Sequence, residues 1–475
     1  MTGRAKRSGR ITLIQQNDIH GQVSEHWERF WNGGTDDYRR AGGAARAAAV
    51  VKGIRAEGRA ALFIDSGDAI HGTLPAMRSE GSAIVPVLNA LKLDAMTPGN
   101  WDYGFGPAVL RERLAGMRFP VLAANLQDAE SGEPILPAYA IAEAGGLRVG
   151  LLGLTSPIVP SMAARFAAGL RFPDARAALS RFTRALRQEE DVDLTVLVSH
   201  LGFPQDVTLA REAGGIDVIL SGHTHNRLER PALAGGARII QSGFSGSFLG
   251  LLELEVERGQ VIDARHRLVP LDENVAPDPE VAEAAAAAEA PWREEMNEIV
   301  GRTAVPLHRY GLLETTMDNL ITGAYRALTG ADVALSHGWR FAPPVPSGDV
   351  RAADLWTMVP TNPEVVTATA RGEQLLALLE ENLQAVLAGD PLQQAGGYLL
   401  RAAGLRVAFR PNNPNGTRVE QVEVAGRPLD PGREYTIATA GTRDLPPGAE
   451  ATGTGTRAID AIRRHLARGE ARPAL

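Results

Sequence analysis

The sequence predicts a layered α/β protein built from two or three domains. Its 475 residues suggest roughly three domains at about 150 residues each, and two large domains also fit. Hydrophobic residues make up 44% of the chain and charged residues 22%, an ordinary composition for a globular protein with a large core. Short β-rich runs alternate with helical stretches through the first half, which is typical of layered α/β architecture.

The β-rich runs of the first half end in polar or glycine-rich turns. They cover residues 11–15, 61–64, 121–123, 149–153, 194–198 and 218–220. Helical stretches are expected at residues 41–57 and 175–190. Several strands run directly into Asp, Asn or His, as in NDIH, DSGD, SH and SGHTH. Because ligands bind beyond the carboxyl ends of the strands in such folds, we expect these polar residues to converge at one edge.

The pattern changes near Pro270. Residues 276–300 have no strand character and strong Ala/Glu helix propensity, so they form either a helix that joins two domains or a surface helix of the first domain. We divide the chain into a first domain at residues 1–272, a linker helix at 273–300 and a second domain at 301–475.

The second half mixes its elements differently and shows no internal repeat of the first. It is expected to contain helices at 315–328 and near 372–388, and strands at 333–336, 405–409 and 435–438.

The composition excludes several classes of site. The 49 Lys and Arg against 56 Asp and Glu give a formal charge of −7 without a basic stripe, so we expect no nucleic-acid polymer as a partner. The chain has no cysteine, which excludes disulfides, thiolate metal sites, iron–sulfur clusters and a cysteine nucleophile. Any metal must therefore be held by His, Asp, Glu and Asn.

The N-terminus and the hydropathy pattern bear on location. The basic stretch MTGRAKRSGR is followed by a short apolar segment, well below the about 7–15 residues of a secretory leader. No window approaches the roughly 18 apolar residues of a membrane span, so we expect no membrane association. These features predict a cytoplasmic protein as the sequence stands, or a periplasmic or exported one if a leader has been removed.

Five clusters in the first half carry residues that can bind a metal. They are Asp18-x-His20, Gly67-Asp68, Gly99-Asn100-Trp101-Asp102, Ser199-His200 and Gly222-His223-Thr224-His225. A divalent cation needs converging oxygen and imidazole ligands. Glycines beside the acidic, amide and imidazole residues permit tight turns and a close approach of the backbone. The alternative, that these histidines are scattered core or turn residues, does not explain why each cluster follows a strand.

The order of the clusters resembles a known family. The calcineurin-like metallophosphoesterases, and among them the two-domain 5′-nucleotidase family, carry DxH, GDxxxG, GNHE/D, a lone His after a strand, and GHxH. Here the motifs read NDIHG, GDAIHGT, PGNWDYGFG, VSHLG and SGHTH. YRRAGGAAR near Tyr38, then DNLITGAYR, HGWR and AGGYLLRAAGLRVAF, extend the likeness over nearly the whole chain. The resemblance implies a four-layer α/β/β/α sandwich followed by a smaller α/β domain.

The resemblance also implies a site with two divalent metal ions, Mn or Zn. One ion would be held by Asp18, His20 and His225, the other by Asn100, His200 and His223, with Asp68 bridging them. The implied chemistry is attack by a metal-bound hydroxide. Arg340 of HGWR matches the family's substrate-anion arginine, and its alternative is a surface arginine in a turn.

The chain departs from the family at the proton donor. Where the phosphoesterases have a His that assists the leaving group, this chain has Trp101, which cannot act as a general acid. His71, at a position usually occupied by Gln, is a candidate proton donor or a residue that supports the ligands. Asp102, which would orient the missing His, is expected to hold a loop instead.

The nucleotide end of the site is altered too. Nucleotidases stack the base between two aromatic residues, whereas here only Tyr398 is a candidate, and the late aromatic motif is missing. Arg401 is a further candidate substrate-binding residue, and together with Trp101 it resembles the sulfur-oxidation branch of the family, the dimanganese thiosulfohydrolases. Those enzymes release sulfate from a sulfur-bound carrier protein, so their leaving group needs little protonation.

Three functions follow, in order of preference. The first is a dinuclear metal-dependent phosphomonoesterase whose partner is a nucleotide or a related small phosphate. The second is a thiosulfohydrolase-like hydrolase whose partner is a sulfur-carrier protein. The third is a metal-binding homologue without catalytic activity, which ranks last because all seven expected ligands are present.

Overall fold

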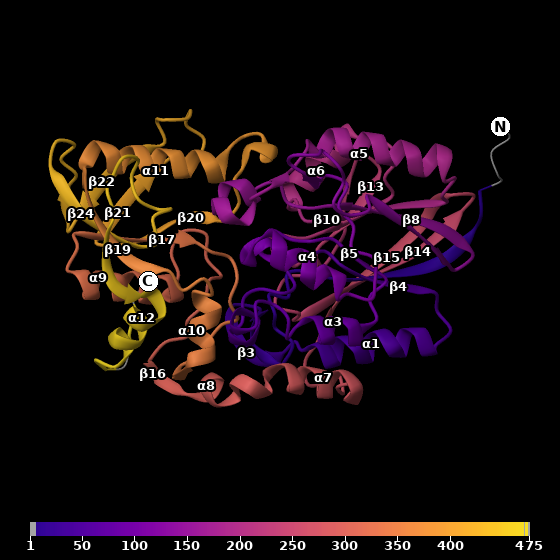
Figure 1. Ribbon diagram of the computed structural model, residues 1–475, viewed down its shortest axis with the longest axis horizontal. Helices are drawn as coiled ribbons and strands as arrows, with labels where there is room; N and C mark the ends of the chain where they lie inside the picture. Colours follow the sequence, from indigo (N-terminus) through magenta and orange to yellow (C-terminus); the bar gives the residue numbers. More distant parts are fainter. Residues whose placement is uncertain (1–5, 470, 474–475) are drawn as a thin grey trace. The chain divides into compact units, whose positions relative to one another are not determined.

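The computed structural model describes residues 6–469 and 471–473, so the first five residues of the basic N-terminal stretch lie outside the described part. The chain divides into two compact units, residues 1–292 and 293–475 (Figure 1). Each unit has its own sheets and its own core. Among the described helices, none has the length and apolar character that a membrane span requires.

The first unit contains two large sheets. The first sheet has the order β15-β14-β1-β4-β5, with β15 at Gln260–Pro270, β14 at Phe248–Glu257, β1 at Gly9–Gln16, β4 at Ala61–Asp65 and β5 at Ala95–Met96. The second has the order β12-β13-β11-β10-β8-β7, with β12 at Ala232–Ala234, β13 at Ala237–Ile240, β11 at Val218–Ser221, β10 at Leu194–Ser199, β8 at Leu147–Leu154 and β7 at Tyr139–Ala144. The central strands of both sheets run parallel, so their carboxyl ends reach a common edge.

The two sheets pack face to face because their strands alternate side chains between two apolar layers. Leu13 of β1 joins Leu151 and Val196 of the second sheet in the core between the sheets. Its neighbour Ile14 points to the other face, where it packs with residues of α1 (Ala44–Ala56), α3 (Val85–Leu91) and α7 (Pro279–Glu289).

Helices α5 (Ala175–Arg184) and α6 (Phe203–Glu212) cover the second sheet. The first unit is therefore a four-layer α/β/β/α sandwich.

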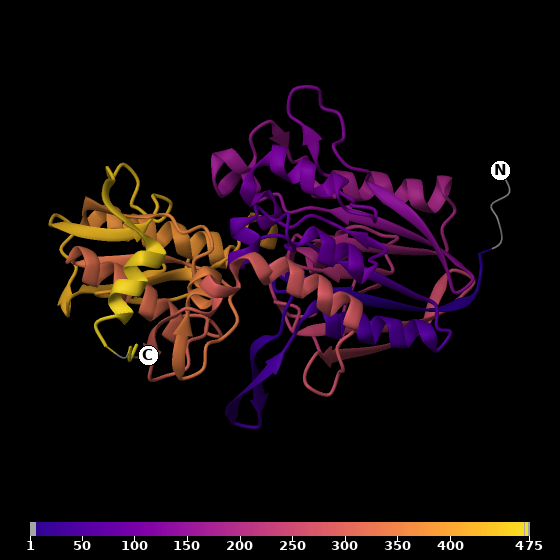
Figure 2. The ribbon, with the colours of Figure 1, turned by 60° about the horizontal axis from the view of Figure 1, so that its bottom comes forward.

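Shorter elements complete the first unit. They are β2 (His26–Asn32), β3 (Thr35–Ala41), α2 (Leu74–Arg78), η1 (Trp101–Phe105), α4 (Pro107–Ala115), β6 (Gln127–Asp128), η2 (Val159–Ser161), η3 (Ala164–Phe166), β9 (Leu170–Arg171), the short π-helix η4 (Ala185–Glu189) and η5 (Ala290–Trp292). Strands β2 and β3 form a hairpin that extends away from the sandwich, visible in indigo in Figure 2.

Two predicted elements differ from the structure. The strand expected at 121–123 is a single bridge from Val121 to Met96, because the amides of residues 122, 123 and 124 bond to three different segments of the chain. The helical segment at 276–300 is broken. Its main part, α7, packs on α1 and α3 and places Val281 and Ala285 in the core of the first unit. The packing of α7 therefore matches the second of the two expectations, a surface helix of the first domain.

The second unit is built on a five-stranded sheet of order β20-β17-β24-β19-β25, with β20 at Tyr398–Ala403, β17 at Val333–Gly338, β24 at Glu434–Ala440, β19 at Glu364–Arg371 and β25 at Thr452–Arg457. Helices α9 (Thr316–Thr329), α10 (Ala352–Met358) and α12 (Ala458–Leu466) pack on one face, and α11 (Gly372–Leu387) on the other. The remaining elements are α8 (Arg293–Asn297), β16 (Ile299–Thr303), β18 (Gly348–Arg351), η6 (Pro391–Gln393), β21 (Leu405–Phe409), β22 (Val419–Val424) and β23 (Arg427–Pro428). This three-layer arrangement is the predicted smaller α/β domain.

Replacement of Leu13 by Ala tests the core between the sheets. We expect Leu13→Ala to lower the free energy of unfolding by about 2–5 kcal/mol, since a fully buried side chain leaves a cavity. Urea denaturation followed by circular dichroism measures the change. Ile262→Ala, on the exposed face of β15, is the control and should stay within about 0.5 kcal/mol. Equal effects of the two substitutions would contradict the assignment of the core.

Candidate metal centre

The candidate ligands of the first unit all follow strands whose carboxyl ends meet. Asp18 lies two residues after β1 and Asp68 three residues after β4. Asn100 follows β5, His200 follows β10 directly, and His223 lies two residues after β11. The two sheets of the sandwich therefore supply ligands from both sides, which is the convergence expected from the sequence.

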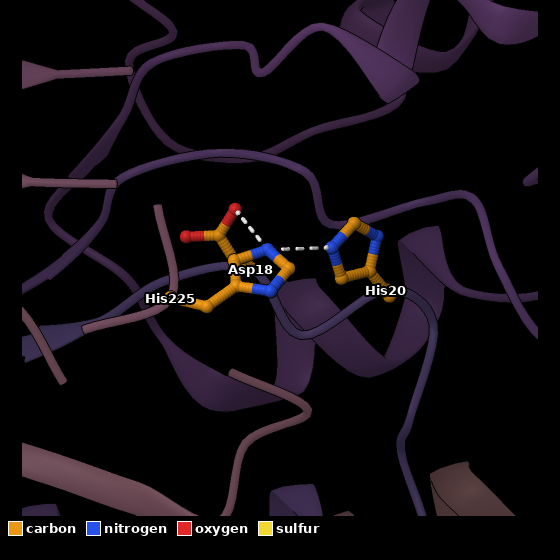
Figure 3. A group of neighbouring side chains, drawn as sticks. All are labelled: Asp18, His20 and His225. Carbon is orange, nitrogen blue, oxygen red and sulfur yellow. Dashed lines mark hydrogen bonds and ion pairs between the residues drawn. The ribbon is translucent and has the colours of Figure 1, made fainter. Parts of the chain in front are cut away.

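One group of ligands consists of Asp18, His20 and His225 (Figure 3). Nε2 of His225 lies 3.2 Å from Oδ1 of Asp18 and 3.2 Å from Nε2 of His20. One ligand atom from each residue lies within 4.8 Å of the others. Two imidazole nitrogens facing each other at this distance, beside a carboxylate, suit a shared cation between them.

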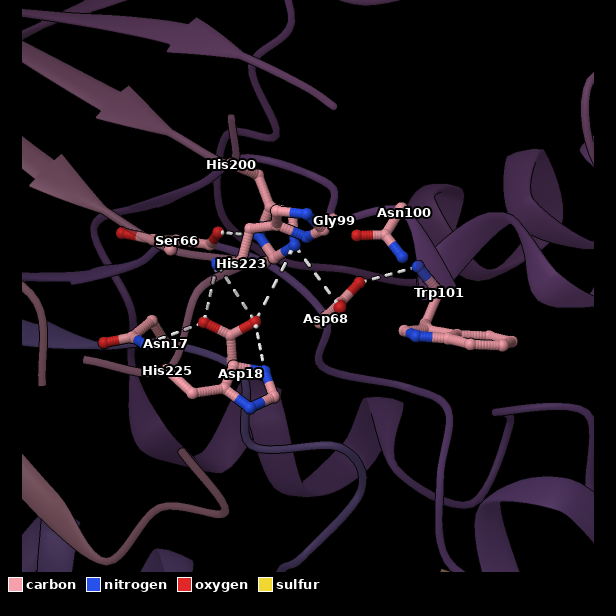
Figure 4. Close-up of polar contacts among 12 residues, drawn as sticks. Asn17, Asp18, Ser66, Asp68, Gly99, Asn100, Trp101, His200, His223 and His225 are labelled. Carbon is pink, nitrogen blue, oxygen red and sulfur yellow. Dashed lines mark hydrogen bonds and ion pairs between the residues drawn. The ribbon is translucent and has the colours of Figure 1, made fainter. Parts of the chain in front are cut away.

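A second group, Asp18, Asp68 and His200, adjoins the first (Figure 4). Nε2 of His200 lies 3.3 Å from Oδ2 of Asp68 and 3.7 Å from Oδ1 of Asp18. The ring of His223 lies 5.4 Å from that of His200, and its backbone N–H donates to Asp18. Asp18 belongs to both groups, whereas the resemblance assigned the bridging position to Asp68.

Asn100 completes the cluster with an amide oxygen. Its Oδ1 is buried and has no hydrogen-bond partner among the described residues, while its Nδ2 lies 3.7 Å from Sδ of Met162. A buried carbonyl oxygen without a donor carries an energetic cost that a cation would remove. The donor set of carboxylates, imidazoles and one amide oxygen therefore fits divalent cations.

The backbone is strained at the candidate ligands. Five of the thirteen non-glycine residues with positive φ in the described chain are candidate ligands: Asp18 (53°), His20 (48°), Asp68 (57°), His223 (71°) and His225 (59°). Such conformations cost of order 1–3 kcal/mol each and persist only where surrounding contacts fix them. Their concentration here is independent support for a functional site.

Backbone bonds between the two ligand loops maintain these conformations. The N–H of Asp18 donates to the carbonyl of Gly67 at 2.8 Å, and the N–H of His20 donates to the carbonyl of Asp68 at 2.8 Å. The N–H of Ser245 in turn donates to the carbonyl of Asp18 at 2.8 Å. Three loops are thereby fixed in register around the ligands.

Glycines allow the loops to approach one another. A Cβ atom on Gly99 would lie 2.2 Å from Oδ1 of Asp68, and one on Gly222 would lie 2.8 Å from the carbonyl oxygen of Ser66. No side chain fits at either distance without displacing the backbone or a ligand. This agrees with the expectation that the glycines beside the ligands permit close approach.

Asp102 holds the loop that carries Asp68. Its two carboxylate oxygens accept hydrogen bonds at 2.8–3.0 Å from four backbone amides, those of Asp68, Ala69, Ile70 and Gly99. Burial and the neighbouring charge of Asp68 raise the pKa of Asp102 to about 6. The carboxylate of Asp102 thus fixes the backbone of the loop that carries Asp68.

The electrostatics of the cluster favour positive charge. Although burial opposes it, the carboxylates of Asp68 and Asp18 raise the pKa of His200 to about 10. The histidines around Asp18 conversely lower the pKa of that carboxyl despite its burial. Two carboxylates that hold a proton on a buried imidazole this strongly would hold a cation in its place.

The rings of Trp101 and His71 pack against each other next to Asn100. Their rings stack at 4.7 Å with an interplanar angle of 21°, and Phe105 lies 5.2 Å from His71. Burial lowers the pKa of His71 to about 3, so its ring is neutral at physiological pH. A neutral imidazole is a weaker proton donor than an imidazolium, so His71 stays a candidate whose role depends on the substrate.

Arg401, in the second unit, is part of a buried ion pair. Its Nε lies 3.2 Å from Oδ2 of Asp318, and both side chains are almost wholly buried. Its other nitrogens donate to the carbonyls of Leu312 and Gly311 at 2.9 and 2.8 Å. Arg309 donates to the other oxygen of Asp318 at 3.0 Å. The guanidinium of Arg401 therefore fixes the loop at residues 311 and 312.

Arg340 and Tyr398 lie close together in the same unit. The guanidinium carbon of Arg340 lies 5.9 Å from the centre of the Tyr398 ring, and that of Arg401 lies 5.6 Å from it. The pairing of Gly338 with Tyr398 between β17 and β20 brings the two segments together. Arg340 is half-buried, in contrast to Arg401.

Asn17, next to the candidate ligand Asp18, was not identified from the sequence. Asn17 donates from Nδ2 to Oδ2 of Asp18 at 2.7 Å and to the carbonyl of Gly243 at 2.6 Å, so it orients the carboxylate. Its place directly before the Asp of NDIH was the available signal.

Comparison with known families agrees with this geometry. Residues 11–227 match the calcineurin-like phosphoesterase family, and residues 299–443 match the 5′-nucleotidase C-terminal domain. The chain belongs to the calcineurin-like phosphoesterases that carry a 5′-nucleotidase C-terminal domain. Membership in this family confirms the predicted four-layer sandwich followed by a smaller α/β domain, and the predicted class of ester-bond hydrolase.

Several relatives of this family resemble the chain over most of its length. Sulfate thiohydrolase SoxB from Thermus thermophilus is 26% identical with a TM-score of 0.91, over 99% of this chain and 96% of that one. A 5′-nucleotidase precursor, also from Thermus thermophilus, is 26% identical with a TM-score of 0.86, over 98% of both chains. Apyrase from Tabanus yao is 26% identical over 90% of this chain and 84% of its own.

The trifunctional nucleotide phosphoesterase protein YfkN from Bacillus subtilis is 25% identical over 87% of this chain. The matched part covers 30% of the length of YfkN.

Removal of the Asp102 carboxylate should destabilise the first unit. We expect Asp102→Ala to lower the free energy of unfolding by more than about 2 kcal/mol, because each buried amide left without an acceptor costs about 1–3 kcal/mol. Urea denaturation of the metal-free protein measures it. Asp174→Ala is the control, since that carboxylate accepts from two exposed amides at the start of α5 and should cost about 1 kcal/mol. A smaller effect at Asp102 than at Asp174 would contradict this role.

Proposed function

We propose that the protein is a dinuclear metal-dependent phosphomonoesterase acting on nucleotides or related small phosphates. The observation that carries the proposal is the pair of overlapping ligand groups that share Asp18 at the joint edge of the two sheets. The names of two relatives, a nucleotide phosphoesterase and a 5′-nucleotidase precursor, support the substrate class.

Seven residues would hold the two ions. In the proposed arrangement they are Asp18, His20, Asp68, Asn100, His200, His223 and His225. Manganese and zinc both suit a mixed nitrogen and oxygen ligand set. When bound, such ions supply a water nucleophile of lowered pKa and neutralise charge that develops on the substrate oxygens.

The substrate contacts are proposed for the second unit. Arg340 would bind the phosphate or another anionic group of the substrate, since a guanidinium matches two anionic oxygens at once. Tyr398 would stack on the nucleobase, because its ring lies beside that guanidinium. Arg401 would support Tyr398 through its contact with that ring.

A second function is favoured by one observation. Trp101 stands where a proton donor is expected, and the imidazole of His71 stacked on it has a lowered pKa and is neutral. The proposed centre is therefore suited to leaving groups that need no protonation. A thiosulfohydrolase-like reaction that releases sulfate from a sulfur-bound carrier has such a leaving group. The likeness to SoxB supports this alternative, although the 5′-nucleotidase precursor is equally identical in sequence.

The metal-dependent activity can be tested directly. Metal-free protein reconstituted with manganese or zinc should hydrolyse an activated aryl phosphate, and Asp68→Asn or His200→Ala should abolish turnover. His266→Asn, which changes a histidine on β15 outside both ligand groups, is the control and should keep wild-type activity. Chelator-insensitive hydrolysis, or full activity of both ligand variants, would exclude the proposed centre.

The identity of the leaving group separates the two functions. We expect the aryl phosphate to turn over much faster than AMP, because the acid that contributes about 10²–10⁴-fold is absent. Trp101→His should raise the rate with AMP more than the rate with the aryl phosphate. Steady-state rates on both substrates and on a thiosulfonate measure this. Efficient AMP hydrolysis by the wild type would contradict the missing acid, and turnover of the thiosulfonate alone would establish the second function.

A further inference from the structure

Gln241 lies at the same edge of the second sheet as the turn at residues 221–226, which carries the GHTH motif. It follows β13 directly, and β13 runs parallel to β11 with Ile240 opposite Leu220. Its side chain is completely buried although it is polar. A buried amide at this position needs partners for all its polar atoms.

Every hydrogen-bonding position of the Gln241 amide is used within one turn. Nε2 donates to Oγ of Ser221 at 3.0 Å and to the carbonyl oxygen of Gly222 at 2.6 Å. Oε1 accepts from Oγ1 of Thr224 at 3.1 Å and from the backbone N–H of Asn226. A glutamine amide has two donor and two acceptor positions, so this side chain is fully satisfied by residues 221–226.

These contacts bracket the two histidines of the turn. Residues 222, 224 and 226 bond to Gln241, and the residues between them are His223 and His225. Figure 4 shows the imidazoles of both histidines beside the other candidate ligands. Both histidines also have positive φ, a conformation that needs fixing from outside. The hydrogen bonds of Gln241 hold the residues that precede and follow each histidine.

We propose that Gln241 is the positioning residue that sets the orientation of His223 and His225, and so couples the two metal positions of the proposed centre. His225 belongs to the group with Asp18 and His20, while His223 adjoins His200 on the other side. One side chain therefore fixes a ligand for each ion. The inference rests on the proposed metal centre and adds a residue that touches no substrate and no ligand atom of the cluster.

Replacement of Gln241 by Met tests this role, because methionine keeps the length of the side chain and removes all four hydrogen bonds. Co²⁺ is titrated into the metal-free protein, and the visible absorption spectrum and the affinity of both binding steps are recorded. We expect Gln241→Met to weaken binding of both ions by about 10- to 100-fold, the usual effect of losing a residue that orients ligands, and to alter the Co²⁺ spectrum.

Two further variants keep the test decisive. Thr224→Val removes one of the four contacts and should weaken binding in the same direction but less. Asn89→Leu removes an amide that bonds the backbone of residues 116 and 118, away from the candidate ligands, and should leave both affinities and the spectrum unchanged. The unfolding midpoint of each metal-free variant is measured alongside.

The possible outcomes separate the two proposals. Absence of Co²⁺ binding by the wild type would overturn the metal centre itself. Wild-type affinity and spectrum in Gln241→Met, even with a lowered unfolding midpoint, would overturn the positioning role and leave the centre intact. A loss confined to one of the two ions would overturn the coupling.

Discussion

The structure of the first unit depends on the burial of carboxylates together with imidazoles at one edge of its sandwich. Asp18 and Asp68 are buried together within reach of His200, and neither carboxylate could remain ionised there without a nearby positive charge. The fold brings them together because parallel strands of two sheets end at the same place. Much of the surrounding architecture, from the glycines to the Asp102 carboxylate, holds these groups at close range.

Two kinds of polar support surround the cluster and differ in what they hold. Asp102 binds backbone amides and thereby fixes the path of the Asp68 loop. Gln241 binds both backbone and side-chain groups of the turn at residues 221–226 and thereby fixes the direction of two imidazoles. Arg401 and Asp318 form a comparable buried support in the second unit, where Arg401 holds the loop at residues 311 and 312 and lies against the Tyr398 ring. Each support lies behind a residue with a proposed chemical role.

The sequence predicted those parts of the site that are written in short, local patterns. NDIH and SGHTH place their candidate ligands within a few residues of a strand end, so the topology of a parallel sheet suffices to bring them together. Gln241 could not be found in this way, because its partners lie 15–20 residues earlier and a single glutamine after a strand has no distinctive pattern. The burial of Arg401 was equally hidden, since Asp318 is remote in sequence. The strand expected at residues 121–123 is reduced to one bridge at Val121 for the same reason, because the partners of its backbone are remote in sequence.

The shared edge of the sandwich has a mechanical consequence. Asp18 and Asp68 belong to loops of the first sheet, whereas His200 and His225 follow strands of the second. An ion held between Asp18 and His225 would therefore act as a cross-link between two sheets whose inner faces meet through apolar packing. Sliding of one sheet over the other would change the spacing of the candidate ligands. The rigidity of the hydrophobic layer between the sheets would therefore limit the range of cation radii that the proposed centre accepts.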